Sequence, residues 1–216
     1  MIPKRQSSGI EVTGSDSIRP SAATPISERK NSVVSGMNSQ QESSSADNRG
    51  PGIPLFDFSG AEPSWYIVND NVMGGVSKSS VFVDPELQRL SFSGAVSLEN
   101  NGGFASVRSR PVEVNLKNGD SITARIRGDG REYTMNLYVP RGSGGYSFRQ
   151  SFKTKKGEWI DVSFPVNTFV ATYRGRVFPN QKLDPNKVNS LGFLLGDKKA
   201  GPFKLEIEWI KVITAE

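Results

Sequence analysis

Three polar segments of the chain contain the residue types that could bind a ligand. The first, WYIVNDNVMGGVS at 65–77, carries Trp65, Asp70 and Asn71 together with two adjacent glycines. Its Asn and Asp side chains and the backbone amides near the glycines could bind a polar ligand, and Trp65 could stack on a sugar ring. The same pattern is typical of a structured turn, in which Asp and Asn bond to their own backbone and glycine supplies positive φ. The residues alone leave both interpretations open.

The second segment, SLENNGGFASVR at 97–108, combines a turn with a charged strand. Its NNGG run, which includes Asn100, is a strong turn signal, and Arg108 lies on the strand that follows. Asp70 and Glu99 could together supply the two carboxylates that glycoside hydrolases use as acid and base. Carboxylates more often serve as caps, turn acceptors and surface charges, so a carboxylate-dependent hydrolase is only a minor alternative.

The third segment, TYRGRVFP at 172–179, places Arg174 and Arg176 on either side of a glycine and beside Tyr173. Such a pair could grip a carboxylate or phosphate through the planar guanidinium fork. An exposed loop whose arginines stack on neighbouring aromatic rings is an equally good interpretation. Three further arginines face away from the predicted core and could extend this surface: Arg127, Arg131 and Arg149.

The composition excludes several kinds of catalytic and metal site. The 216 residues include no histidine and no cysteine, which rules out Ser-His-Asp and Cys-His catalysis, disulfides and thiolate metal ligation. The net charge is only +5, from 27 basic and 22 acidic residues, and no long run of like charge is present. Nucleic-acid binding is therefore not expected. We expect a non-enzymatic binding protein with no cofactor and no metal.

Two observations bear on location. No stretch approaches the roughly 20 apolar residues that span a bilayer. The N-terminus lacks the apolar core of a secretory signal, and its acidic residues argue against an organelle presequence despite its serines and arginines. A cytoplasmic protein is the simplest expectation, with a mitochondrial location as the alternative in a eukaryote.

The elements that must position these residues are short strands. Residues 1–53 are rich in serine and poor in aromatics, which predicts a disordered tail, and residues 54–216 form the predicted folded domain. Within the domain, period-two alternation recurs between Gly, Pro, Asn and Asp turn signals, as at 121–127 and 133–139. Many short alternating strands at this spacing indicate a β-sandwich or jelly roll.

The last alternating run, at 203–210, predicts a strand with one face toward the core. It places four apolar residues on one face and three charged ones on the other, and the apolar four are Phe203, Leu205, Ile207 and Trp209. Trp209 is therefore predicted to anchor the core.

Five motifs in order resemble the complex I intermediate-associated protein 30 family. They are DNVMGGVS at 70–77, SLENNGGFASVR at 97–108, GDGREY at 128–133, FVATYRGR at 169–176 and LDPNKVNSLGFLLGDKKAGPFKLEIEWI at 183–210. The resemblance covers nearly all of the predicted domain and none of the tail. It implies an all-β, galactose-binding-like jelly-roll β-sandwich, in agreement with the strand pattern.

The resemblance also implies a function. Mitochondrial members of that family act in assembling respiratory NADH:ubiquinone oxidoreductase, so we expect an assembly factor or chaperone whose partners are protein subunits of a large membrane complex. A carbohydrate- or small-ligand-binding module on the same fold is the alternative, and the oligomeric state is left open. The candidate binding residues are Trp65, Asp70, Asn71, Asn100, Arg108, Tyr173, Arg174 and Arg176.

Overall fold

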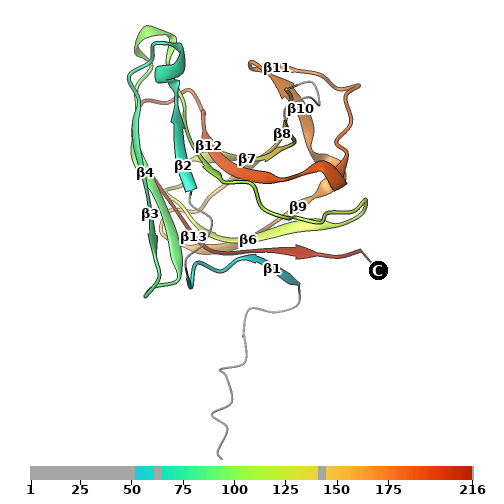
Figure 1. Cartoon of the computed structure of the whole chain (residues 1–216). Helices are drawn as coiled ribbons and strands as arrows, with labels where there is room; N and C mark the ends of the chain where they lie inside the picture. Colours follow the sequence, from blue (N-terminus) through green and yellow to red (C-terminus); the bar gives the residue numbers. More distant parts are fainter. Residues whose placement is uncertain (1–51, 61–64, 141–144, 216) are drawn as a thin grey trace, which may run out of the picture. The chain divides into compact units, whose positions relative to one another are not determined.

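The computed structural model describes residues 52–60, 65–140 and 145–215, so most of the predicted tail at 1–53 lies outside the described residues (Figure 1). The described chain is a sandwich of two sheets whose strand ladders are all antiparallel. It contains short 3-10 turns and no α-helix within these residues. The turns are η1 (Asp70–Met73), η2 (Glu99–Asn101), η3 (Val166–Thr168) and η4 (Pro185–Lys187).

The first sheet has the order β3-β4-β13-β6-β9, and β1 pairs with β13 beyond the end of β4. Its strands are β1 (Ile53–Phe56), β3 (Lys78–Asp84), β4 (Arg89–Val96), β6 (Ser121–Arg127), β9 (Trp159–Pro165) and β13 (Gly201–Ile213). Ile53, which the sequence assigns to the tail, pairs with Val212, so the ordered sheet includes it.

The second sheet has the order β11-β10-β8-β7-β12-β5-β2. Its strands are β2 (Trp65–Asn69), β5 (Ala105–Ser109), β7 (Glu132–Tyr138), β8 (Ser147–Lys153), β10 (Val170–Tyr173), β11 (Arg176–Val177) and β12 (Ser190–Leu195). Figure 1 shows β2 on one side of the middle strands β12 and β7, and β10 and β11 on the other.

The core lies between the two sheets and is rich in aromatic rings. Phe152 of the second sheet meets Phe164 of the first with ring centroids 5.3 Å apart, and it contacts Phe193 at 6.2 Å. Alternating strand residues bury one face of each sheet, as period two requires. The prediction of an all-β jelly-roll sandwich is therefore confirmed.

The strand phase predicted for Trp209 is wrong. A β-bulge interrupts the pairing of β13 with β6 between Ile207 and Trp209, and one extra residue there reverses which face the later side chains occupy. Trp209 pairs with the outward-facing Arg125, whereas Ile210 takes the core position opposite Ala124. Trp209 is nevertheless buried, with the Lys211 ammonium 4.9 Å from its ring centroid.

Replacing Trp209 with alanine should cost less than replacing Phe203 on the core face of the same strand. We expect about 3 kcal/mol for Trp209→Ala, the lower end of the range for an emptied aromatic site, because surrounding chains on the outer face can collapse or hydrate. Urea unfolding of both variants checks this ranking. A larger loss of unfolding free energy for Trp209→Ala than for Phe203→Ala would show that Trp209 lies on the core face.

Candidate functional site

The buried carboxylate of Asp70 ties together the first two predicted segments. It lies at the start of η1, where Oδ1 accepts a hydrogen bond from the Ser77 backbone N–H (3.0 Å). Oδ2 accepts from the Ser77 hydroxyl (2.5 Å) and from the backbone N–H groups of Gly103 (2.7 Å) and Phe104 (3.2 Å). Asp70 is fully buried, so its side chain fixes two loops to each other and faces no ligand.

Two glycines make room for this carboxylate. A Cβ at Gly75 would lie 2.4 Å from Asp70 Cγ, and one at Gly102 would lie 2.6 Å from Asp70 Oδ2. Any other residue at either position would push the carboxylate out of its hydrogen bonds. The glycine pairs of both motifs are thus explained, in part, by close approach to one side chain.

Hydrogen bonding sets the charge state of Asp70. Burial raises the pKa of the carboxyl, but the donors on Ser77, Gly103 and Phe104 outweigh it and hold the pKa below the ordinary value of 3.8. The carboxylate is therefore ionised near neutrality and saturated with donors. Asp70 is buried and fully hydrogen-bonded, so its position does not suit the acid or base role considered for it together with Glu99.

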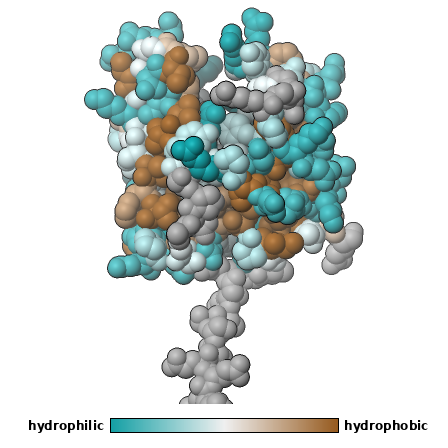
Figure 2. All heavy atoms as spheres, in the orientation of Figure 1, coloured by the Kyte–Doolittle hydropathy of each residue, from teal (hydrophilic) through white to brown (hydrophobic). Residues whose placement is uncertain are grey.

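Around this buried anchor the loops expose apolar side chains. We define the loop tip as Val72, Met73, Val76 and Leu98, all of which are exposed. The Ser77 hydroxyl links the two loops, since it accepts from the Ser97 N–H at 2.9 Å. Figure 2 shows hydrophobic atoms at the upper left of the molecule, where Figure 1 places the loops next to β2. A rigid base thus carries solvent-facing hydrophobic residues.

The predicted role of Trp65 in ligand stacking is wrong. Its ring is buried against Phe56, at a centroid distance of 5.0 Å, and against Phe58 at 6.1 Å. β2 turns this side chain inward because Trp65 and Ile67 occupy the face opposite to Tyr66. The exposed aromatic residue of this strand is the neighbouring Tyr66.

The two predicted asparagines border the loop tip. Asn71 is exposed in η1, and its carbonyl accepts from the Gly74 N–H at 3.1 Å. Asn100 is exposed and left-handed, with φ 54° and ψ 37°, a conformation that asparagine tolerates better than most residues. Both are therefore available at the surface beside the apolar side chains.

The third predicted segment forms a separate hairpin. Arg174 (φ 47°) and Gly175 (φ 78°) both have positive φ and connect β10 to β11 as a tight two-residue turn. Arg174 lies 5.4 Å from the ring centroid of Tyr173, and the exposed Arg176 pairs with Tyr173 in the ladder. The predicted stacking of an arginine on a flanking ring is present, on an exposed hairpin far in sequence from the loop tip.

Arg108 belongs to neither group of loops. It lies half-buried on β5, and its guanidinium is 4.6 Å from the ring centroid of Tyr138. The eight predicted residues therefore do not form one site. They lie in the loops joined by Asp70, in the β10–β11 hairpin, on the face of β5 and, for Trp65, in the core.

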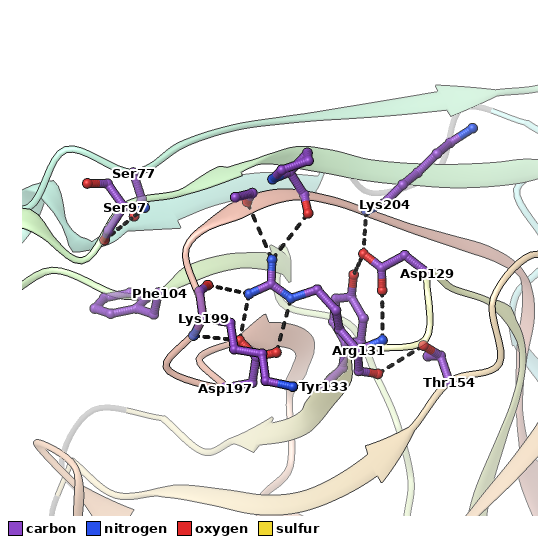
Figure 3. A network of polar contacts seen from close by, with 12 residues as sticks. Ser77, Ser97, Phe104, Asp129, Arg131, Tyr133, Thr154, Asp197, Lys199 and Lys204 are labelled. Atoms are coloured by element: carbon purple, nitrogen blue, oxygen red, sulfur yellow. Dashed lines mark hydrogen bonds and ion pairs between the residues drawn. The ribbon is translucent and has the colours of Figure 1, made fainter.

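A partly buried polar network that the sequence did not reveal surrounds Arg131 of the GDGREY motif (Figure 3). Arg131 forms a bidentate pair with Asp197, at 3.0 Å from Nε and 2.6 Å from Nη2. Its guanidinium also donates to three backbone carbonyls, those of Lys199, Gly201 and Pro202. This residue, predicted as part of an anion-binding surface, instead fixes the loop between β12 and β13.

The neighbouring Asp129 closes the same network. Its Oδ2 accepts from the Tyr133 hydroxyl (3.1 Å) and the Lys204 N–H (3.0 Å), as Figure 3 shows. Arg127, also predicted at the surface, pairs with Glu206 at 2.8 Å. Of the three extra arginines, Arg149 alone has no acidic partner within the described residues. Asp129 and Arg127 therefore form contacts within the protein and serve to hold its loops and strands in place.

Two absences concern the described residues only. No group of three or more acidic side chains there could hold a metal ion. Among the same residues, no helix is long and apolar enough to cross a membrane.

Comparison with known proteins settles the family. Residues 56–207 match the model of the family described as Complex I intermediate-associated protein 30. The chain belongs to this family. It is 28% identical over 173 residues to "Complex I intermediate-associated protein 30, mitochondrial" of Mus musculus, covering 69% of this chain and 52% of that protein. It is 33% identical over 146 residues to the probable Caenorhabditis briggsae protein of that name, covering 65% and 42%. The chain thus spans about half the length of these relatives.

Solved structures support the fold alone. The chain resembles the family 11 carbohydrate-binding module of Clostridium thermocellum, solved with a mixed-linked tetrasaccharide, with a TM-score of 0.57 and 17% identity. That match covers 76% of this chain and 95% of the module. An agarase matches with a TM-score of 0.52 and 10% identity, covering 76% of this chain and 26% of the enzyme. At these identities the likeness establishes the β-sandwich fold and says nothing about which ligand this chain binds.

Proposed function

We propose that this protein is an assembly factor that binds protein subunits of respiratory NADH:ubiquinone oxidoreductase, or of an intermediate of that complex, through its loop tip. Family membership and the names of the relatives support the assembly role. The observation that carries the docking site is the loop tip itself. Exposed apolar side chains on a base fixed by a buried carboxylate cost little entropy when a partner covers them.

The relatives also bear on location. Those from Mus musculus, Caenorhabditis elegans and Drosophila melanogaster are named mitochondrial, which favours the mitochondrial alternative over the cytoplasmic expectation. We therefore propose that the partner is met at the mitochondrial inner membrane, where a respiratory complex is built. A carbohydrate-binding role has support only from fold likeness, and a soluble glycan added to the protein would test it.

Replacing Val72 and Met73 with serine should reduce capture of the partner about tenfold or more. Two apolar anchors at the centre of an interface each contribute more than about 1 kcal/mol. Capture from mitochondrial membrane extracts, read by quantitative mass spectrometry of respiratory subunits, measures the effect. The matched control is Phe82→Ser on β3, which is 64% exposed, as is Met73. Equal loss in both variants, or no loss in either, would contradict docking at the loop tip.

We further propose that the β10–β11 hairpin adds a charged contact to the partner. Changing Arg174 and Arg176 to lysine keeps the charge but removes the planar fork, so capture should fall while the melting temperature stays unchanged. The turn geometry tolerates lysine as well as arginine at the exposed position 174. Co-purification and thermal melts of the double variant check this, and full recovery of partner would show that the two arginines are only solvated charge.

A further inference from the structure

The outward face of the seven-stranded sheet carries a row of polar residues that the proposed docking site does not use. Strand register places Arg108 of β5 opposite Gly192 of β12, Gly192 opposite Asn136 of β7, and Asn136 opposite Arg149 of β8. Directly opposed residues share a face, and their neighbours Val107, Phe193, Met135 and Phe148 fill the core. The row therefore faces away from the core.

Gly192 lets Arg108 lie across its neighbouring strand. A Cβ at Gly192 would sit 2.3 Å from the Val107 carbonyl oxygen and 3.2 Å from Arg108 Cγ, so no side chain fits there. The Arg108 side chain passes over this gap and reaches Tyr138, two strands away, where its guanidinium is 4.6 Å from the ring centroid. The guanidinium is thus held over the middle of the sheet.

The hydrogen bonding of this row is incomplete. Asn136 is fully buried, and its Oδ1 has no hydrogen-bond partner, nor has the buried Nε of Arg108. The Nε of Arg149 meets only the Ser147 hydroxyl, at 3.3 Å. Buried polar atoms in folded proteins almost always have a partner, so two unpartnered atoms in one row show that the fold alone does not satisfy the polar groups there.

The row also carries two positive charges, those of Arg108 and Arg149. Within the described part of the chain, Arg108 and Arg149 form no ion pair, whereas the outward arginines of the other sheet, Arg89, Arg125 and Arg127, all do. Burial lowers the pKa of Arg149, and the nearby positive charge of Arg108 lowers it as well. Two half-buried positive charges that act on each other destabilise the protein, and an anion bound to both would relieve that repulsion.

We propose that this row, Arg108, Asn136, Tyr138 and Arg149, binds the phosphate or carboxylate group of a small hydroxylated molecule. The two guanidinium groups grip the oxyanion. Asn136 is fully buried in the row between them and makes no direct contact with the ligand. At the end of the row, the exposed Tyr66 ring, with the Arg110 guanidinium 5.3 Å from its centroid, offers a flat face to the rest of the ligand. The inference does not rest on the proposed assembly role.

Titration of the whole chain with four probes tests the ligand chemistry. Inorganic phosphate, glucose 6-phosphate, citrate and glucose are followed by calorimetry and by the arginine Nε–H signals in the NMR spectrum. We expect the phosphorylated or carboxylated probes to bind and to move two arginine signals, with glucose 6-phosphate or citrate tighter than inorganic phosphate. Glucose binding as tightly as glucose 6-phosphate, or no binding by any charged probe, would overturn the proposal.

Charge-neutralising variants locate the site. Arg108→Gln and Arg149→Gln, singly and together, should weaken binding of the best charged probe at least about tenfold, the loss expected for one charge-assisted hydrogen bond. Arg125→Gln, on the other sheet, is the matched control and should bind normally. Unchanged binding in the double variant would overturn the assignment.

The melting temperature without ligand separates a binding role from a structural one. Because an uncompensated, half-buried charge destabilises the empty protein, the Arg149→Gln chain should melt at the same temperature as the wild type or higher. A melting temperature several degrees lower would show that Arg149 serves the fold, and it would contradict the proposal.

Discussion

Changing Asp70 to asparagine should lower the free energy of unfolding by about 3–5 kcal/mol. The carboxylate accepts four hydrogen bonds while fully buried, and an amide of the same shape would turn an NH₂ group toward backbone N–H donors. Unsatisfied buried donors and the lost charge both contribute to the effect. Urea unfolding measures it, with the exposed Asp184→Asn as control, for which a change within about 0.5 kcal/mol is expected.

The same variant should change the acid sensitivity of the protein. Because the folded pKa of Asp70 lies below its ordinary value of 3.8, its ionised form stabilises the fold fully above that pH. That contribution is lost as the pH falls below about 3.8 and through the folded pKa, where the unfolded chain binds the proton more readily. Stability should therefore fall less steeply below pH 4 in Asp70→Asn than in the wild type. Parallel curves for the two would contradict the assigned role.

Replacing Arg131 with methionine should cost about 3–5 kcal/mol. The change leaves Asp197 almost fully buried without its cation and leaves three carbonyls without a donor. The exposed pair of Arg125 and Asp161 provides the contrast, since Arg125→Met should cost less than about 1 kcal/mol. Equal losses in these two variants would mean that the Arg131 network is open to water.

A second substitution separates the pair from its surroundings. Adding Asp197→Leu to Arg131→Met removes the stranded carboxylate, so part of the lost stability should return. The double variant should be more stable than Arg131→Met alone. If the double variant were less stable than Arg131→Met, by the amount that Asp197→Leu costs alone, Asp197 would act independently of Arg131.

The architecture could be predicted from the chain because alternation at period two is a local property. The strands predicted at 121–127 and 133–139 match β6 and β7 closely, and their turn signals fall between strands. The phase of Trp209 could not be predicted in the same way. A bulge adds one residue without changing the composition of the strand, and its position depends on how β13 pairs with β6.

The sequence singled out two loops that meet in the structure, but it did not show the role of each residue in them. The loops around Asp70 and Asn100 do lie together, yet the burial of Asp70 depends on N–H groups more than 30 residues later. Arg131 and Arg149 look alike in an alternating pattern, and only the fold pairs the former with Asp197. Long-range partners decide which polar residues are structural, and period-two alternation contains no information about them.

The central claim, that the loop tip touches a partner, is tested most directly by a photo-crosslinking amino acid at Met73. The same group at Phe82, equally exposed but on the β3 edge, is the control. Irradiation in mitochondria, followed by mass spectrometry of the adducts, identifies what each position contacts. We expect subunits of the respiratory NADH:ubiquinone oxidoreductase at Met73 and not at Phe82. Adducts with those subunits from Phe82 alone, or none from Met73, would contradict the account.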